Sequence, residues 1–268
     1  MISKILRDLG VGFESGSDSC MEDKPALVMI HGAGGCAGIW KNQTHPLNDY
    51  MNAFALDLPG HGKTSGQGMA GISEYSTWLN DILERAFETP VFLMGHSMGG
   101  AIAQDVAINN PHLVKGNILA GTGPRLRVAR AFLDGLLKNF EDTVDEIMRY
   151  AYAPGVNDSW IREGAGLMKK PGSIVVRNDF LACDGFDSMN EIQNIKTPCL
   201  VICGEKDKLT PVFLSNKLTE NIRGSRLTVI PSAGHMVMIE RYKEFNECIR
   251  EFVWGIEAAF IHDNSKIC

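Results

Sequence analysis

Short, continuous apolar runs recur along the chain and predict buried β-strands. Each run ends at a glycine or a polar turn. They cover residues 26–30, 53–56, 91–94, 116–121, 199–203 and 226–230. Uninterrupted apolar runs, rather than strict alternation, are typical of strands whose two faces are both covered by other elements.

Helical patterns separate most of these runs. Ser73 is a plausible N-cap for a helix over 74–87, and further helices are predicted at about 99–109, 211–220 and 239–254. Residues 39–48 are compatible with either a helix or a loop, and glycines in residues 1–24 suggest a small hairpin or edge element. The alternation predicts an α/β fold with a mostly parallel central sheet and helices on both faces.

Residues 124–190 interrupt this rhythm, because they carry helical patterns and few strand signals. Four helices are predicted there, over 125–140, 141–153, 157–169 and 173–183. The chain therefore divides into a sheet-forming core, made of residues 1–123 and 191–268, and a helical insertion over 124–190.

Composition narrows the class of partner. The 268 residues are 44% hydrophobic and 22% charged, with a net charge of -6. A long basic run is missing, which argues against nucleic acid as a partner. The N-terminus is charged too early for a signal peptide, and every apolar run falls short of the roughly 18 residues of a membrane span. We expect a cytoplasmic monomer or homodimer acting on a small molecule.

The seven cysteines do not form a recognisable metal or disulfide pattern. They are Cys20, Cys36, Cys183, Cys199, Cys203, Cys248 and Cys268, an odd number without a Cys-x-x-Cys pair. Reduced and mostly buried thiols are the expected state. The sequence points to neither a metal nor a cofactor.

The chemically most informative segment is Gly-His-Ser-Met-Gly at 95–99, between an apolar run and a helical pattern. A strand, a tight turn and a helix in that order raise the hydroxyl of Ser97 above the edge of the sheet, where helix amides can stabilise an anion. We therefore predict that Ser97 is a nucleophile.

A serine nucleophile needs a base and an acid that orients the base. His235 follows the last strand between small residues, so it is the predicted base, whereas His31, His61 and His96 are expected to support loop backbones. Asp207, just past the strand 199–203, is favoured as the acid over Glu205 and Asp57. Glu205 follows its strand too closely, and Asp57 opens a turn whose amides it is expected to hold.

The remaining site residues are predicted from the neighbouring loops. The amide of Met98 and an amide of the glycine loop at 31–35, best that of Ala33, are expected to bind the oxyanion. Trp40 and Met236 are candidate substrate contacts, and so are Arg125 and Arg127, which are suited to a carboxylate or a phosphate.

These motifs resemble the α/β-hydrolase superfamily over nearly the whole chain. They are His-Gly-Ala-Gly-Gly at 31–35, Asp-Leu-Pro-Gly-His-Gly at 57–62, Gly-His-Ser-Met-Gly-Gly at 95–100, Gly-Glu-Lys-Asp at 204–207 and Ala-Gly-His at 233–235. The resemblance implies a nucleophile, acid and base at Ser97, Asp207 and His235, and a lid over the active site at 124–190.

The resemblance leaves several branches open. The motifs are similar to those of monoacylglycerol lipases, of small esterases and enol-lactonases, and of carbon–carbon bond hydrolases. Dehalogenases and epoxide hydrolases are disfavoured, because they have an aspartate where this chain has Ser97. We expect hydrolysis of an ester, thioester or lactone of a small or medium acyl group. The alternatives are an acyltransferase, a carbon–carbon bond hydrolase, or a binding protein without catalytic activity.

Overall fold

The computed structural model describes residues 1–17, 21 and 23–264, and these residues form a seven-stranded sheet with the strand order β1-β3-β2-β4-β5-β6-β7. The strands are β1 (Phe13–Ser15), β2 (Ala26–Ile30), β3 (Asn52–Leu56), β4 (Val91–His96), β5 (Val114–Ala120), β6 (Cys199–Gly204) and β7 (Arg226–Ile230). Strand β1 pairs antiparallel with β3 at one edge, and the other described pairs are parallel. The predicted fold class, with its mostly parallel sheet, is confirmed.

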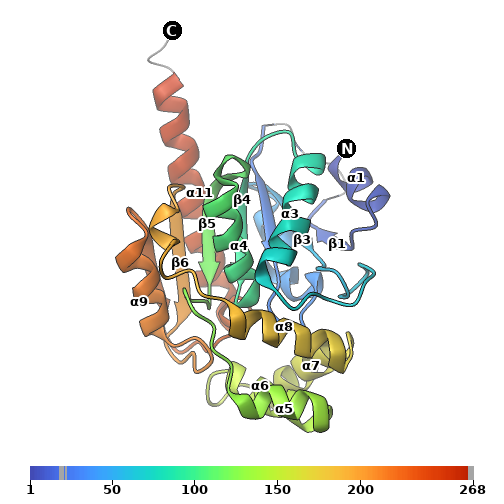
Figure 1. The fold of residues 1–268 in the computed structure, drawn as a ribbon. Coiled ribbons are helices and arrows are strands. Elements are labelled where there is room, and N and C mark those ends of the chain that lie inside the picture. The colour runs from blue at the N-terminus through green and yellow to red at the C-terminus, as the bar shows by residue number, and fades with distance from the viewer. Residues whose placement is uncertain (18–20, 22, 265–268) are drawn as a thin grey trace.

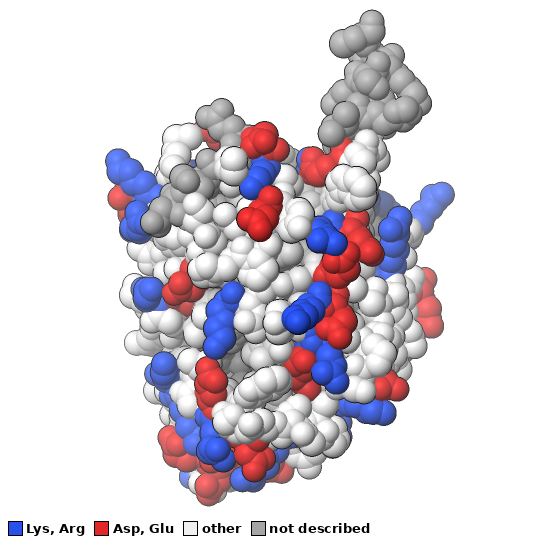
Figure 2. Space-filling view, turned by 180° about the vertical axis from the view of Figure 1, so that it is seen from behind, with Lys and Arg blue, Asp and Glu red and all other residues white. Residues whose placement is uncertain are grey.

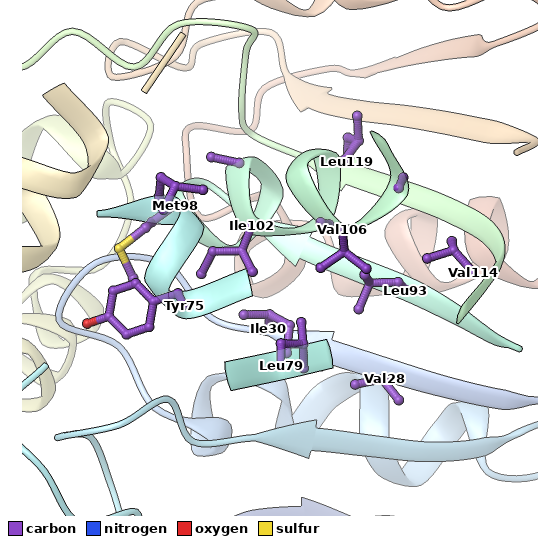
Figure 3. Packing of buried hydrophobic residues seen from close by; sticks show 14 of the residues in the cluster. Val28, Ile30, Tyr75, Leu79, Leu93, Met98, Ile102, Val106, Val114 and Leu119 are labelled. Atoms are coloured by element: carbon purple, nitrogen blue, oxygen red, sulfur yellow. The ribbon is translucent and has the colours of Figure 1, made fainter. Parts of the chain in front are cut away.

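Helices cover both faces of the sheet because its strands are apolar on both sides (Figure 1). In β2, Val28 and Ile30 pack toward α3 (Ile72–Ala86) and α4 (Met98–Asn109), as Figure 3 shows. Leu27 and Met29 belong to the opposite core, which includes residues of α2 (Lys41–Leu47) and α11 (Tyr242–Asn264). The smaller elements are α1 (Ile2–Asp8), α9 (Val212–Asn221), α10 (Val237–Glu240) and the 3₁₀ turns Ala37–Trp40, Pro111–Leu113 and Ile192–Asn194.

Three of the predicted helices have wrong bounds. Helix α3 starts at Ile72 with Gly71 as its N-cap, rather than after Ser73. The first insertion helix starts at Arg130 rather than Arg125, because the preceding segment is extended and forms a β-bridge with Asp187. The last helical region is divided in two at Arg241, whose φ of -135° interrupts the helix, and α11 (Tyr242–Asn264) continues past the predicted end at Trp254.

Four helices lie between β5 and β6, as the pattern of residues 124–190 predicts. They are α5 (Arg130–Lys138), α6 (Phe140–Ala151), α7 (Asp158–Lys169) and α8 (Ser173–Gly185). In Figure 1 they gather beyond the end of the sheet toward which the arrow of β5 points. They have a small apolar core of their own, which includes Leu136, Ile147 and Tyr152. Whether they act as a lid stays a prediction.

Basic and acidic side chains are interspersed over the face of the molecule that is drawn in Figure 2. Within the described residues, none of the helices is long and apolar enough to cross a membrane.

The described cysteines are free thiols. Cys183, Cys199 and Cys203 are buried, and Cys36 and Cys248 are partly exposed. Cys20 and Cys268 lie outside the described residues.

Candidate active site

Ser97 occupies a sharp turn between β4 and α4. Its backbone is left-handed, with φ 54° and ψ -115°, and only Ser232 shares a positive φ among the described residues other than glycine. A Cβ at Gly95 would collide with the carbonyl of Gly99, and a Cβ at Gly99 would collide with the carbonyl of Ile30. The spacing Gly-x-Ser-x-Gly is therefore a steric requirement of this turn.

His235 and Asp207 come from different loops and meet after β6 and β7. His235 Nδ1 donates to Asp207 Oδ2 at 2.8 Å, and both side chains are buried. Asp207 also accepts from the amides of Leu209 and Thr210 at 2.9 and 2.8 Å, and from Thr210 Oγ1 at 2.8 Å. Burial raises the pKa of Asp207, but the charge and hydrogen bonds of its partners outweigh burial and lower it. Asp207 is thus held as a carboxylate.

One cavity of about 880 Å³ brings the predicted residues together. Ser97, His235 and Ala33 all line it. Because Nδ1 of His235 is engaged by Asp207, Nε2 is the ring nitrogen left for the cavity. In the described part of the chain, Ser97 Oγ forms no hydrogen bond, so the hydroxyl is available to a bound molecule.

Of the two predicted oxyanion amides, that of Met98 follows Ser97 directly in the chain, and Ala33 lines the same cavity as Ser97. Met98 is the first residue of α4, and its side chain lies beside Tyr75 in the core, as Figure 3 shows. Ala33 belongs to the loop that follows β2. Neither amide donates to another described residue, so both donors are free to bind an anion.

The glycine-rich turns contain the three histidines that were expected to support loop backbones, and this prediction is confirmed. His31 Nδ1 donates to Gly32 O at 2.8 Å, and His61 Nδ1 donates to Pro59 O at 3.1 Å. His96 Nε2 donates to the carbonyl of His235 at 2.9 Å. Burial, followed by the charge of His235, lowers the pKa of His96 to about 3, so His96 stays neutral.

Neither rival for the acid lies beside His235. Asp57 accepts from the amides of Ala37 and Lys63 at 2.6 and 2.9 Å, as expected of an aspartate that opens a turn. Glu205 is exposed and accepts from the amide of Ser232 at 3.1 Å. Both carboxylates hold loop backbone.

The predicted substrate contacts divide into two groups. Met236, Arg125 and Arg127 line the cavity, although Arg125 Nε lies 2.6 Å from Asp187 Oδ2 and Arg127 donates to the carbonyl of Asp184 at 2.7 Å. Trp40 does not line it. Its ring is wholly buried beneath His96, with centroids 6.5 Å apart, and packs on Phe245, so the prediction of a substrate contact is corrected. An indole at the end of a 3₁₀ turn completes a core more readily than it reaches a cavity.

Most of the cavity wall comes from apolar side chains of the inserted helices and their neighbours. These include Phe132, Ile147, Met148, Trp160, Leu167, Met168, Phe180 and Leu209. Such a wall suits an acyl chain.

Sequence reasoning missed two residues that brace His235, the predicted base. Thr210 Oγ1 lies 3.1 Å from His235 Nδ1 as well as bonding to Asp207. Glu240 accepts from the amides of Ala153 and Gly234, each at 3.0 Å, and so joins the end of α6 to the loop of His235. Thr210 is close enough to Asp207 in sequence to have been considered, whereas the contact of Glu240 with Ala153 spans 87 positions.

In the ranges 1–17, 21 and 23–264, His, Cys, Asp and Glu side chains form no cluster that could hold a metal ion. What the arrangement offers at one apolar cavity is a free hydroxyl, a histidine oriented by a carboxylate and the free amide of Ala33, with the free amide of Met98 next to Ser97 in the chain. These are the parts required for attack on a carbonyl and for binding the oxyanion that forms.

Known proteins resemble this chain in sequence and in fold. Residues 27–247 match the model of the alpha/beta hydrolase family. A pimeloyl-[acyl-carrier protein] methyl ester esterase of Vibrio campbellii is 25% identical over 248 residues, which cover 85% of this chain and 94% of the relative. The solved structure of a thermophilic esterase is 31% identical, with a TM-score of 0.80, and the match covers 92% of this chain and 98% of that one. The enol-lactonase of Burkholderia xenovorans LB400 has a TM-score of 0.83 at 18% identity, over 91% and 96% of the two chains, which is a likeness of fold.

Proposed function

The chain belongs to the α/β-hydrolase family and is an ester hydrolase of that fold, and we propose that it cleaves its ester through an acyl-enzyme on Ser97. The observation that carries the proposal is the convergence of Ser97, His235 and the Ala33 amide on one cavity, with Asp207 bonded behind the histidine.

In the proposed reaction, His235 Nε2 takes the proton of Ser97 as Oγ attacks the ester carbonyl. The amides of Ala33 and Met98 donate to the oxyanion of the tetrahedral intermediate. Asp207 keeps the proton of His235 on Nδ1 and stabilises the imidazolium. His235 then protonates the leaving alcohol, and it later activates the water that releases the acid.

For the substrate we propose an ester with a small or medium acyl chain. The apolar wall around Met148, Leu167 and Met236 supports this chain type. The name of the Vibrio campbellii relative states that it acts on a methyl ester of an acyl chain, which is consistent with such a substrate. Helices α5–α8 supply much of the wall, and we propose that they form the lid that selects the acyl group.

A fluorophosphonate probe tests the acyl-enzyme. Intact-mass analysis of the wild type should show one adduct, peptide mapping should place it at Ser97, and Ser97→Ala should gain none. If the wild type stays unlabelled under conditions that label a control esterase, the proposal is wrong.

A panel of p-nitrophenyl esters of increasing chain length, run beside lactones and acyl thioesters, defines the substrate class. We expect kcat/KM to peak at a short or medium chain. Product analysis with an added alcohol or amine separates hydrolysis from acyl transfer, since a transferase would form the new ester or amide in preference to the free acid.

A further inference from the structure

A buried carboxylate of the inserted helices reaches the glycine loop beside Ser97. Asp179, in α8, has no exposed surface and is not used by the proposed chemistry. Its Oδ2 accepts from the amide of Gly34 at 2.7 Å and from His61 Nε2 at 2.9 Å. Its Oδ1 accepts from the hydroxyl of Tyr75 at 2.6 Å. One side chain thus joins three segments of the core that are distant in sequence.

The loop holds Ala33 between two peptide groups, and the first of them is fixed within the loop. Gly32 O accepts from the amide of Gly35 at 3.0 Å and from His31 Nδ1 at 2.8 Å. Because His31 Nε2 accepts from the amide of Leu58 at 3.1 Å, the ring proton must be on Nδ1. A trans peptide group is planar, so fixing Gly32 O also fixes the opposite direction for the Ala33 N–H.

The second peptide group runs from the carbonyl of Ala33 to the amide of Gly34, and Asp179 is the side chain that holds it. Gly34 has φ +65°, so it belongs to neither a β-strand nor an α-helix, and no regular secondary structure restrains the loop at this residue. Rotation of this second group would displace Gly34 and Gly35, and Gly35 is a donor that fixes Gly32 O, so the free amide of Ala33 would turn away from the oxyanion. The loop therefore needs an anchor at Gly34.

We propose that Asp179 is a positioning residue, which orients the Ala33 amide by holding the peptide group that follows it. The inference rests on the proposed function, because it assumes that the Ala33 amide binds an oxyanion. It makes the catalytic geometry of the core depend on the seating of α8, one of the helices proposed as a lid.

The partners of Asp179 explain why a carboxylate occupies this place. His61 donates from both ring nitrogens, to Pro59 O and to Asp179 Oδ2, so the ring is an imidazolium paired with the carboxylate. Burial lowers the pKa of His61, but the hydrogen bond and charge of Asp179 outweigh burial and raise it. Separating the two partners would leave a buried charge uncompensated, so the carboxylate of Asp179 stays against His61.

The test compares kcat with KM in matched variants. Asp179→Ala removes the acceptor for Gly34, whereas Asp179→Asn retains one oxygen that can face Gly34 while its NH₂ group faces Tyr75. Tyr75→Phe is the control, because it removes a buried hydrogen bond to Asp179 Oδ1 and leaves the bond from Gly34 in place. All variants are assayed below their unfolding transitions, as monitored by circular dichroism.

For Asp179→Ala we expect kcat on a p-nitrophenyl ester to fall about 10- to 100-fold with KM little changed, since oxyanion donors act mainly in the transition state. The inhibition constant of an alkyl trifluoromethyl ketone, whose hemiketal with Ser97 carries an oxyanion, should rise by the same factor. Asp179→Asn should restore most of kcat, and Tyr75→Phe should stay within about threefold of the wild type. If Asp179→Ala does not fold, Asp179→Glu takes its place, because it keeps the charge and displaces the anchor.

Equal loss of kcat in Asp179→Ala and Tyr75→Phe would overturn the inference, since it would mean that Asp179 only stabilises the fold. An unchanged kcat in Asp179→Ala, or in Asp179→Glu where that variant replaces it, would overturn it too. These outcomes differ from failure of the proposed function, in which the wild type itself neither hydrolyses esters nor binds the fluorophosphonate at Ser97.

Discussion

Replacement of Asp207 by Asn tests whether this carboxylate sets the tautomer of His235. The amides of Leu209 and Thr210 donate to Oδ1 at 2.9 and 2.8 Å, so the oxygen of the Asn side chain must occupy that position. Its NH₂ group then takes the place of Oδ2, which lies 2.8 Å from His235 Nδ1. An NH₂ group only donates, so Nδ1 must lose its proton to Nε2. The ring can then no longer accept the proton of Ser97.

The expected loss in kcat is about 10,000-fold, or roughly 5.5 kcal/mol of transition-state stabilisation, as for the wrong tautomer in serine proteases. The fold should survive, because the two backbone bonds to the side chain remain and the lost charge-assisted bond is worth about 1.5–3 kcal/mol. Initial rates on a p-nitrophenyl ester and thermal unfolding by circular dichroism measure the two effects.

Thr210→Val is the matched control for Asp207→Asn. It deletes the hydroxyl that donates to Asp207 Oδ2 at 2.8 Å but leaves the carboxylate bonded to His235. If the lost hydrogen bond to a charged group has an energy at the lower end of the usual range, we expect about a tenfold loss in kcat. Activity of Asp207→Asn within tenfold of the wild type, or an equal loss in Thr210→Val, would refute the tautomer argument.

Three further predictions address the turn, a helix and the pH dependence. Gly99→Ala should lower kcat/KM by about 100-fold or more, because the Cβ of the alanine would collide with the backbone of β2 and displace Ser97. Labelling of Ser97 by the fluorophosphonate probe at the wild-type rate would contradict this. Gly166→Ala, at an exposed and open site in α7, should add about 0.5–1 kcal/mol to the free energy of urea unfolding, and an unchanged midpoint would be evidence against it. The pKa of Asp207 is lower in the folded state than its usual value of 3.8. Ionisation of Asp207 therefore stabilises the fold at any pH above 3.8, and this stabilisation is lost as the pH falls through the pKa of the folded state. The gap in unfolding free energy between the wild type and Asp207→Asn should therefore narrow from pH 7 to pH 3, and a constant gap would exclude this linkage.

Local signals in the sequence were sufficient for the fold class. Continuous apolar runs between glycine-rich turns mark buried parallel strands whatever their partners, so β2 to β7 were predicted. Helix boundaries that depend on contacts between distant residues could not be predicted from local signals. The segment 125–129 is extended because it pairs with Asp187 and donates the amide of Val128 to Asp184, and a helical pattern within the segment cannot report such contacts.

By itself the sequence determined which residues can carry the chemistry. The turn at 95–99 requires glycines beside Ser97, and His235 and Asp207 each follow a strand, so all three side chains were expected at the same edge of the sheet. These features are local, because they follow from strand ends and from the steric demands of one turn.

Only the tertiary structure decided what supports and surrounds these groups. Asp179 meets Gly34 across 145 positions, and Trp40 turns into the core rather than toward the cavity. A buried carboxylate in a helix and an indole after a glycine-rich loop have no local pattern that reveals their partners. Their places follow from the packing of α8 against α3 and α4 and of α11 against the sheet, because folding must give a buried polar group its hydrogen bonds and a large ring its contacts.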